Sequence, residues 1–268
     1  MHKIIAPLLV LATVSIFSAC GSNATDENTI RVGIVAGPEK DIAETAKKVA
    51  KEQYNLEVEL VTFNDYVMPN EALSTGDIDA NAFQHTPYLS EQSKQRGYKL
   101  AAVGNTFVYP IIAYSKKIKS LDQLSANATI AIPNDPTNGG RSLLMLQEQG
   151  LIKLKDGVGI LPKVIDITEN PKNLRILELE APQLPKVLDD QEVTIAIINN
   201  NFAAQAGLNA EEFGLFREGK ESPYVNLIVT REDNKDLEKV KNFVKAYQSE
   251  EVEKKAQELF KGQAIKGW

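Results

Sequence analysis

The sequence predicts an α/β protein made of two lobes, each a sheet flanked by helices. Two observations predict this fold class. Short apolar or alternating segments typical of strands are followed repeatedly by segments with apolar residues at helical spacing. Two extended apolar segments, 106–114 and 222–230, interrupt that order without a linker rich in Gly, Ser or charged residues. We interpret them as two crossings of the chain between the lobes.

The first twenty residues predict export and a membrane anchor. Lys3 precedes an apolar run over 4–17, and Ser18, Ala19 and Cys20 follow it. This run is shorter than the roughly 20 residues that span a bilayer, so residues 1–19 are predicted to be a cleaved signal peptide. The stretch FSAC resembles a bacterial lipobox, in which the cysteine carries the lipid. The alternative for Cys20 is a reactive or buried thiol.

The residues after the cysteine predict a flexible tether over 20–29, because GSNATDENT is small and polar without a hydrophobic period. Removing residues 1–19 from 268 leaves 249, enough for one large domain or two lobes. The formal net charge of -6 becomes -7 when Lys3 is lost. This acidic balance argues against nucleic acid as a partner, because its phosphates require clustered Lys and Arg.

The first lobe is predicted from alternating strand and helix patterns. A strand that ends before Gly37 and Pro38 is followed by a segment with Ile42, Ala46 and Val49 on one helical face. Repeated units of this kind predict a parallel sheet, with ligands bound at the carboxyl ends of its strands. The expected strands are 30–37, 56–63 and 77–83, and the expected helices are 39–54, one within 64–76, and 86–97.

The second lobe follows the first crossing and has the same patterns. Its expected strands are 128–133, 163–167, 174–179 and 193–198, and its expected helices are 135–150 and one near 181–190. Two helices, 234–247 and 249–261, are expected after the second crossing. The resulting domain prediction is that residues 30–109 and 228–268 form lobe I and residues 110–227 form lobe II.

Signatures of enzymes are mostly missing. His2 leaves with the signal peptide, so a histidine-dependent triad would have to use His85, and no G-x-S-x-G motif accompanies it. Paired cysteines, H-E-x-x-H, Walker and G-x-G-x-x-G motifs are also missing. Asp77 and Asp79 are interpreted as part of a solvated turn, not as a catalytic pair. A hydrolase that uses His85 remains the alternative, and a structural or adhesive lipoprotein is a third class.

The stretch DANAFQHTPY, residues 79–88, places Phe83, His85 and Tyr88 close together just before a helix. By themselves these residues are compatible with core packing, with a catalytic base, or with the wall of a small-molecule pocket.

Long stretches resemble a known family, the NlpA lipoproteins that bind methionine for bacterial ABC importers. They include VELVTFNDYVMPNEALSTGDIDANAFQHTPYL, IPNDPTNGGRSLLMLQ and SPYVNLIVTREDNKD, and the similarity runs from about residue 30 to Trp268. The resemblance implies a two-lobed periplasmic-binding-protein fold with methionine, L or D, in the cleft between the lobes. It implies a monomer that is anchored to the membrane through Cys20, faces the periplasm or the cell exterior, and delivers methionine to a permease and ATPase without cofactor, metal or catalysis.

The same resemblance implies where methionine binds. Its carboxylate needs a cation and helix N-terminal amides, which Arg141 and the backbone of Gly139 and Gly140 supply in NDPTNGGR. Its ammonium needs the amide oxygens of asparagines, and its thioether needs soft aromatic walls. Asn200 and Asn201 are not included in the predicted set. The predicted ligand-binding residues are Tyr66, Phe83, His85, Tyr88, Asn138, Arg141, Asn199 and Asn226.

Overall fold

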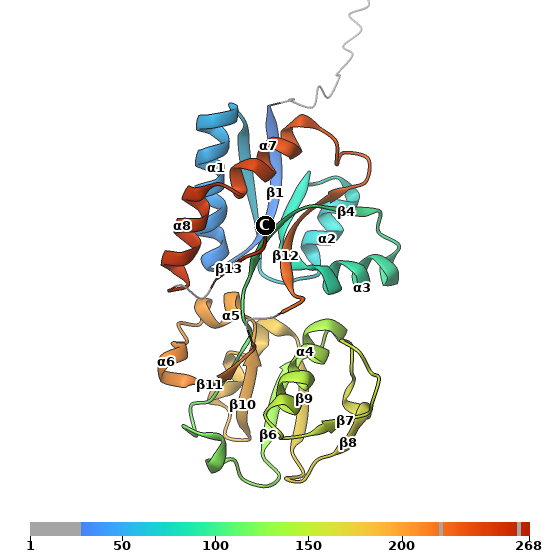
Figure 1. The fold of residues 1–268 in the computed structure, drawn as a ribbon, viewed down its shortest axis with the longest axis vertical. Coiled ribbons are helices and arrows are strands. Elements are labelled where there is room, and N and C mark those ends of the chain that lie inside the picture. Colours follow the sequence, from blue (N-terminus) through green and yellow to red (C-terminus); the bar gives the residue numbers. More distant parts are fainter. Residues whose placement is uncertain (1–27, 220–221, 262–263) are drawn as a thin grey trace, which may run out of the picture.

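The computed structural model describes residues 28–219, 222–261 and 264–268. The predicted signal peptide, Cys20 and most of the predicted tether lie outside these residues. No helix in the described part of the chain is long and apolar enough to cross a membrane. The chain forms two lobes, one above the other in Figure 1.

The upper lobe, called lobe I, is built on a six-stranded sheet of order β13-β4-β12-β3-β1-β2. Figure 1 shows α1, α7 and α8 toward one side of this lobe and α2 and α3 toward the other. Its strands are β1 (Thr29–Val35), β2 (Glu57–Phe63), β3 (Ala80–His85), β4 (Leu100–Val108), β12 (Val225–Arg231) and β13 (Ile265–Lys266). Its helices are α1 (Pro38–Tyr54), α2 (Met68–Thr75), α3 (Thr86–Arg96), α7 (Glu238–Tyr247) and α8 (Glu250–Leu259).

The lower lobe, called lobe II, contains a five-stranded sheet of order β11-β5-β10-β6-β9 and a small hairpin of β7 and β8. The strands are β5 (Ile112–Tyr114), β6 (Thr129–Pro133), β7 (Lys153–Leu154), β8 (Ile167–Glu169), β9 (Arg175–Leu179), β10 (Val193–Ile198) and β11 (Gly214–Arg217). The α-helices are α4 (Pro136–Glu148), α5 (Asn200–Gln205) and α6 (Ala210–Phe213). Short 3-10 helices are η1 (Leu121–Gln123), η2 (Val164–Asp166), η3 (Ala181–Gln183) and η4 (Lys186–Asp189).

The expectation of parallel sheets is correct for three neighbouring strands in each lobe. Strand β1 runs parallel to β2 and β3, and β6 runs parallel to β9 and β10. The strands next to the crossings are antiparallel: β12 to both β3 and β4, and β5 to both β10 and β11. They are antiparallel because a chain that leaves one lobe and returns to it enters the sheet from the opposite end.

The two crossings join β4 to β5 and β11 to β12. Strand β12 begins at Val225 and pairs there with Val108, so the predicted lobe boundary at 228 falls inside a strand of lobe I. Each lobe has its own apolar core, with Ile34 and Phe243 in lobe I and Ile132 and Leu146 in lobe II. A further cluster contains residues of both lobes and lies where they meet.

Three predicted elements are wrong for local reasons. The expected strand 163–167 begins as a 3-10 turn, because Asp166 accepts the backbone N–H of Lys163 at 2.8 Å. The expected helix near 181–190 is two 3-10 turns, and Pro182 and Pro185 cannot donate the hydrogen bonds of an α-helix. The expected helix 234–247 begins four residues later, because Asn234 makes a turn and bonds to the loop before β3.

Candidate functional site

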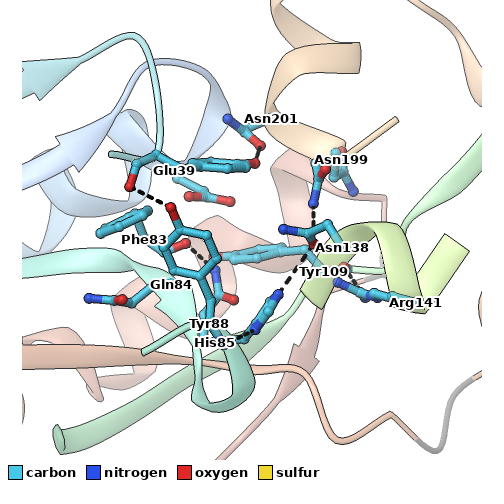
Figure 2. Close-up of a pocket in the computed structure, with 13 residues that line it drawn as sticks. Glu39, Phe83, Gln84, His85, Tyr88, Tyr109, Asn138, Arg141, Asn199 and Asn201 are labelled. Carbon is cyan, nitrogen blue, oxygen red and sulfur yellow. Dashed lines mark hydrogen bonds between the residues drawn. The ribbon is translucent and has the colours of Figure 1, made fainter. Parts of the chain in front are cut away.

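A pocket between the lobes is lined by all eight predicted ligand-binding residues (Figure 2). Lobe I supplies the end of β3, the loop before α2 and the start of β12, whereas lobe II supplies the first turns of α4 and α5. The sequence analysis did not assign Glu39, Gln84, Tyr109, Asn200 and Asn201 to this pocket, which they also line.

Aromatic rings form one wall of the pocket. The ring of Tyr66 stacks on Phe83 with centroids 5.8 Å apart, and Phe202 of lobe II lies 4.9 Å from Tyr66. Tyr88 meets Phe83 edge-on, and its hydroxyl group donates to the backbone oxygen of Tyr66 at 2.9 Å. Tyr66 in turn donates to the side-chain oxygen of Asn201 at 2.6 Å, across the two lobes. The wall is therefore apolar, polarizable and fixed by hydrogen bonds at its edge.

His85 is held as a neutral imidazole. It is the N-cap residue of α3, where its Nδ1 accepts the backbone N–H of Tyr88 at 3.1 Å. That bond leaves the proton on Nε2, which faces the side-chain oxygen of Asn138 at 3.3 Å. Burial, followed by the nearby Arg141 guanidinium, lowers the pKa of His85 to about 3. The ring is therefore uncharged at neutral pH, and both of its nitrogens already have partners.

Arg141 is buried, and Glu218 neutralises it. Its Nε donates to Glu218 at 2.8 Å, and its Nη2 contacts the second oxygen of the same carboxylate and the backbone oxygen of Tyr109. The guanidinium also lies 4.3 Å from the centre of the Tyr224 ring. Nη1 has no hydrogen-bond partner among the described residues. Arg141 thus forms a buried ion pair with a residue of the second crossing.

The first turn of α4 does not present free amides to an anion. The carboxylate of Asp135 accepts the N–H groups of Thr137 at 3.1 Å and Asn138 at 2.9 Å, and the backbone oxygen of Asp135 accepts that of Gly139 at 2.8 Å. Gly140 lies against the backbone of 160–162, where a Cβ would approach to about 3.0 Å. The amides of Thr137, Asn138 and Gly139 therefore already have acceptors within the protein, and Gly140 serves close packing.

Asn138 connects the two lobes through its side chain. Its oxygen accepts a hydrogen bond from Asn199 at 2.9 Å and faces His85, and its nitrogen donates to Asp135 at 2.9 Å. Because Asn199 donates its NH₂ group, its side-chain oxygen stays buried without a partner among the described residues. Asn226 donates to the backbone oxygen of Phe83 at 3.1 Å. The asparagines thus leave acceptor atoms available at the pocket.

Glu39 is the charged pocket residue that the sequence analysis missed. Gly37 caps α1 with a φ of 122°, and Pro38 then places Glu39 in the first turn, where an acidic residue normally faces solvent. In this fold α5 approaches the start of α1, since a Cβ on Gly37 would lie 3.1 Å from the backbone oxygen of Asn201, and Glu39 lines the pocket with Asn200 and Asn201. Glu39 is 6% exposed, and burial raises its pKa to about 8. No local pattern in the sequence predicts that Glu39 is buried.

Two α/β lobes with a pocket between them, lined by a cation, amide acceptors and aromatic rings, define an extracytoplasmic substrate-binding protein of the type that serves ABC importers. The chain belongs to the NlpA lipoprotein family, whose model matches residues 30–268.

Among its relatives, the D-methionine-binding lipoprotein MetQ of Escherichia coli (strain K12) is 66% identical over 249 residues, which cover 93% of this chain and 92% of that protein. A crystal structure of the methionine-binding protein MetQ superposes with a TM-score of 0.89 at 67% identity, covering 91% of this chain and 99% of that one. A nutrient-binding protein from Burkholderia cenocepacia bound to methionine superposes with a TM-score of 0.86 at 50% identity, covering 89% of this chain and all of that one.

Proposed function

We propose that this protein captures methionine outside the cytoplasm and delivers it to the permease and ATPase of an ABC importer. One observation carries the proposal: a single pocket gathers every residue that the family resemblance assigns to methionine. The names of the relatives, which bind methionine or D-methionine, support the same ligand. The protein acts as a monomer and catalyses no reaction.

The pocket offers a partner for each part of methionine. Nη1 of Arg141 is the cationic donor left for the carboxylate, because Glu218 occupies the other side of the guanidinium. The free oxygen of Asn199, together with Asn226, accepts the ammonium group. The aromatic wall around Tyr66 and Phe83 takes the thioether, whose sulfur gains roughly 0.3 to 1.5 kcal/mol from each aromatic contact.

The alternative function, a hydrolase that uses His85 as a base, gains no support from the site. A general base needs a lone pair directed at substrate and a pKa near the working pH. The Nδ1 lone pair of His85 instead caps α3, and the pKa of about 3 keeps the ring from accepting a second proton at neutral pH. We therefore assign His85 to the pocket wall, where it packs edge-on against Tyr224 at 5.0 Å.

Methionine is expected to stabilise the protein and to make it more compact. Several hydrogen bonds join the lobes near the pocket, among them Tyr66 to Asn201, His85 to Asn138, and Gln205 to the backbone oxygen of Ala36 at 2.6 Å. A ligand that contacts both lobes favours the state in which these bonds form. At 100 times its dissociation constant, methionine should add about 2.7 kcal/mol to the free energy of unfolding.

Thermal melts and small-angle scattering with methionine, and with alanine as a control that lacks the thioether, measure both effects. Mass spectrometry of the small molecules released from denatured protein identifies any ligand retained from the cell. An unchanged melting temperature in saturating methionine would contradict the proposed function. Turnover of a substrate would favour the hydrolase.

The anchor is expected to depend on Cys20 and to be independent of the pocket. Cys20→Ser should leave methionine binding unchanged and release the protein from membranes, because each buried lipid methylene contributes about 0.8 kcal/mol of membrane affinity. Membrane fractionation combined with mass spectrometry of the N-terminus tests this prediction. Variant protein that stays in the membrane fraction after signal cleavage would refute the lipid anchor.

A further inference from the structure

The pocket contains a buried carboxyl group that has no hydrogen-bond donor among the described residues. Glu39 is 6% exposed and lines the pocket, and no described residue forms a hydrogen bond or ion pair with its side chain. In Figure 2 it lies with Asn201 at one edge of the drawn group, whereas His85 lies at the other. Burying a carboxyl group without a hydrogen-bond partner lowers the stability of the folded protein, unless a ligand supplies that partner. Glu39 is therefore a candidate for direct contact with a ligand.

Glu39 is the acidic residue among the side chains that line the pocket, and it has no counter-ion among the described residues. Arg141 is paired with Glu218, and His85 is neutral. The carboxyl group of Glu39 contributes to the raised pKa values of both Tyr66 and Tyr109. The carboxyl group of Glu39 therefore lies near the side chains of these two tyrosines. The empty site thus has a fixed cation that is already compensated and an ionisable carboxyl group that has no charged partner.

The surroundings of Glu39 match the requirements of an ammonium group. The rings of Tyr66 and Tyr109 line the same pocket, and aromatic faces attract cations. The unpartnered oxygen of Asn199 is a second acceptor in this pocket. A carboxylate, an amide oxygen and aromatic rings bind a cationic group together, whereas they offer nothing to the carboxylate of a ligand.

We propose that the carboxyl group of Glu39 binds the ammonium group of the ligand and makes the pocket select ligands that carry this positive charge. The inference rests on the proposed function, since it names the group that recognises one end of methionine. It adds a charged acceptor to the asparagines and gives the pocket separate anionic and cationic ends, as a zwitterion requires.

Binding should then be coupled to the release of a proton. In the empty pocket the pKa of Glu39 is about 8 because of burial, so the carboxyl group is mostly protonated at pH 7. A bound ammonium favours the ionised form and lowers this pKa, so binding below pH 8 expels a proton and strengthens as pH rises toward 8. The facing hydroxyls of Tyr66, Tyr109 and Tyr247 have raised pKa values and stay neutral in this range. His85 is also neutral, and Arg141 is paired with Glu218.

The test compares two ligands that differ only in the ammonium group: methionine and 4-(methylthio)butanoate, which keeps the carboxylate and the thioether. Glu39→Gln preserves the shape of the side chain and removes its charge. It should weaken methionine binding about tenfold or more and change binding of the analogue by less than about twofold. Asp41→Asn is the matched control, because it removes an exposed acidic charge from the same turn of α1. It should alter neither affinity.

Titration calorimetry at pH 7 in two buffers of different ionisation enthalpy gives a second readout that needs no variant. The parent protein should release up to one proton per methionine bound and none with the analogue. Equal losses of affinity for both ligands in Glu39→Gln, or unchanged affinities, would overturn the inference, as would methionine binding by the parent without proton release. A parent protein that binds neither compound would contradict the proposed function itself, and the inference with it.

Discussion

Arg141→Ala is expected to weaken methionine binding by roughly 30-fold to several thousand-fold, which corresponds to about 2 to 5 kcal/mol. Arg141 is 3% exposed, and its Nη1 is the donor that we propose for the carboxylate of methionine. Without it, the carboxylate of methionine would lie in a site that excludes water and would face the charge of Glu218. Both effects oppose binding.

The same variant should also destabilise the fold, because it leaves Glu218 buried without its partner. Breaking a buried ion pair in this way costs about 3 to 5 kcal/mol. Calorimetric titrations must therefore be made at a temperature where circular dichroism shows folded protein. Glu218→Gln is the matched control, since it disturbs the pair but keeps the cation. It should lower the melting temperature and preserve methionine binding.

Folded Arg141→Ala protein that binds methionine as tightly as the parent would contradict the assignment of Arg141 to the carboxylate. Loss of methionine binding in Glu218→Gln to the same extent as in Arg141→Ala would show that the pair supports the shape of the pocket and not the recognition of charge.

Asn199→Ala is expected to weaken methionine binding by about 1 to 3 kcal/mol, or roughly 5-fold to 150-fold. Its side-chain oxygen is buried and has no partner among the described residues, so a bound ammonium group is the donor that it lacks. Removing Asn199 also takes one donor from Asn138, which connects the lobes. Because every amino acid carries the same ammonium group, methionine and leucine should lose similar factors of affinity.

His85→Ala provides the contrast, because His85 belongs to the wall near the aromatic rings. Its effect on methionine should be smaller, and the preference for methionine over leucine should decrease. Calorimetric titration of both variants with both ligands separates the polar end of the pocket from the apolar end. If His85→Ala abolished all binding while Asn199→Ala did not, the two assignments would be wrong and a chemical role for His85 would have to be reconsidered.

The sequence predicts the fold to the level of its main elements because periodicity is a local property. Helix α1 and the parallel strands β1, β2 and β6 occur within a few residues of their predicted positions. The segments that fail are those in which one side-chain contact or a proline sets the backbone, such as Asp166 with Lys163 and the two prolines of 181–190. Small strands such as β11 and β13 were missed, because they owe their pairing to neighbours far away in the sequence.

The sequence also identified the predicted site residues as a group, although periodicity alone did not find them. Phe83, His85 and Tyr88 are compatible with a core, a catalytic site or a pocket when taken alone. The long family resemblance selected the pocket, and the structure places them there with Asn138 and Arg141 of the other lobe. Their individual roles as ligand contacts stay predictions until the variants are measured.

By itself, the sequence determined the α/β class, the two crossings and the family, since each is carried by patterns along the chain. Only the tertiary structure decided the partners of the polar groups: Glu218 lies 77 residues from Arg141, and Asn201 lies 135 residues from Tyr66. Burial of Glu39 belongs to the same group, because Glu39 lies in a pocket that residues of both lobes line, and α5 of the other lobe approaches the start of α1. Charge pairing and burial depend on which surfaces of the two lobes contact each other. Local sequence patterns do not predict these contacts, because the residues involved are far apart along the chain.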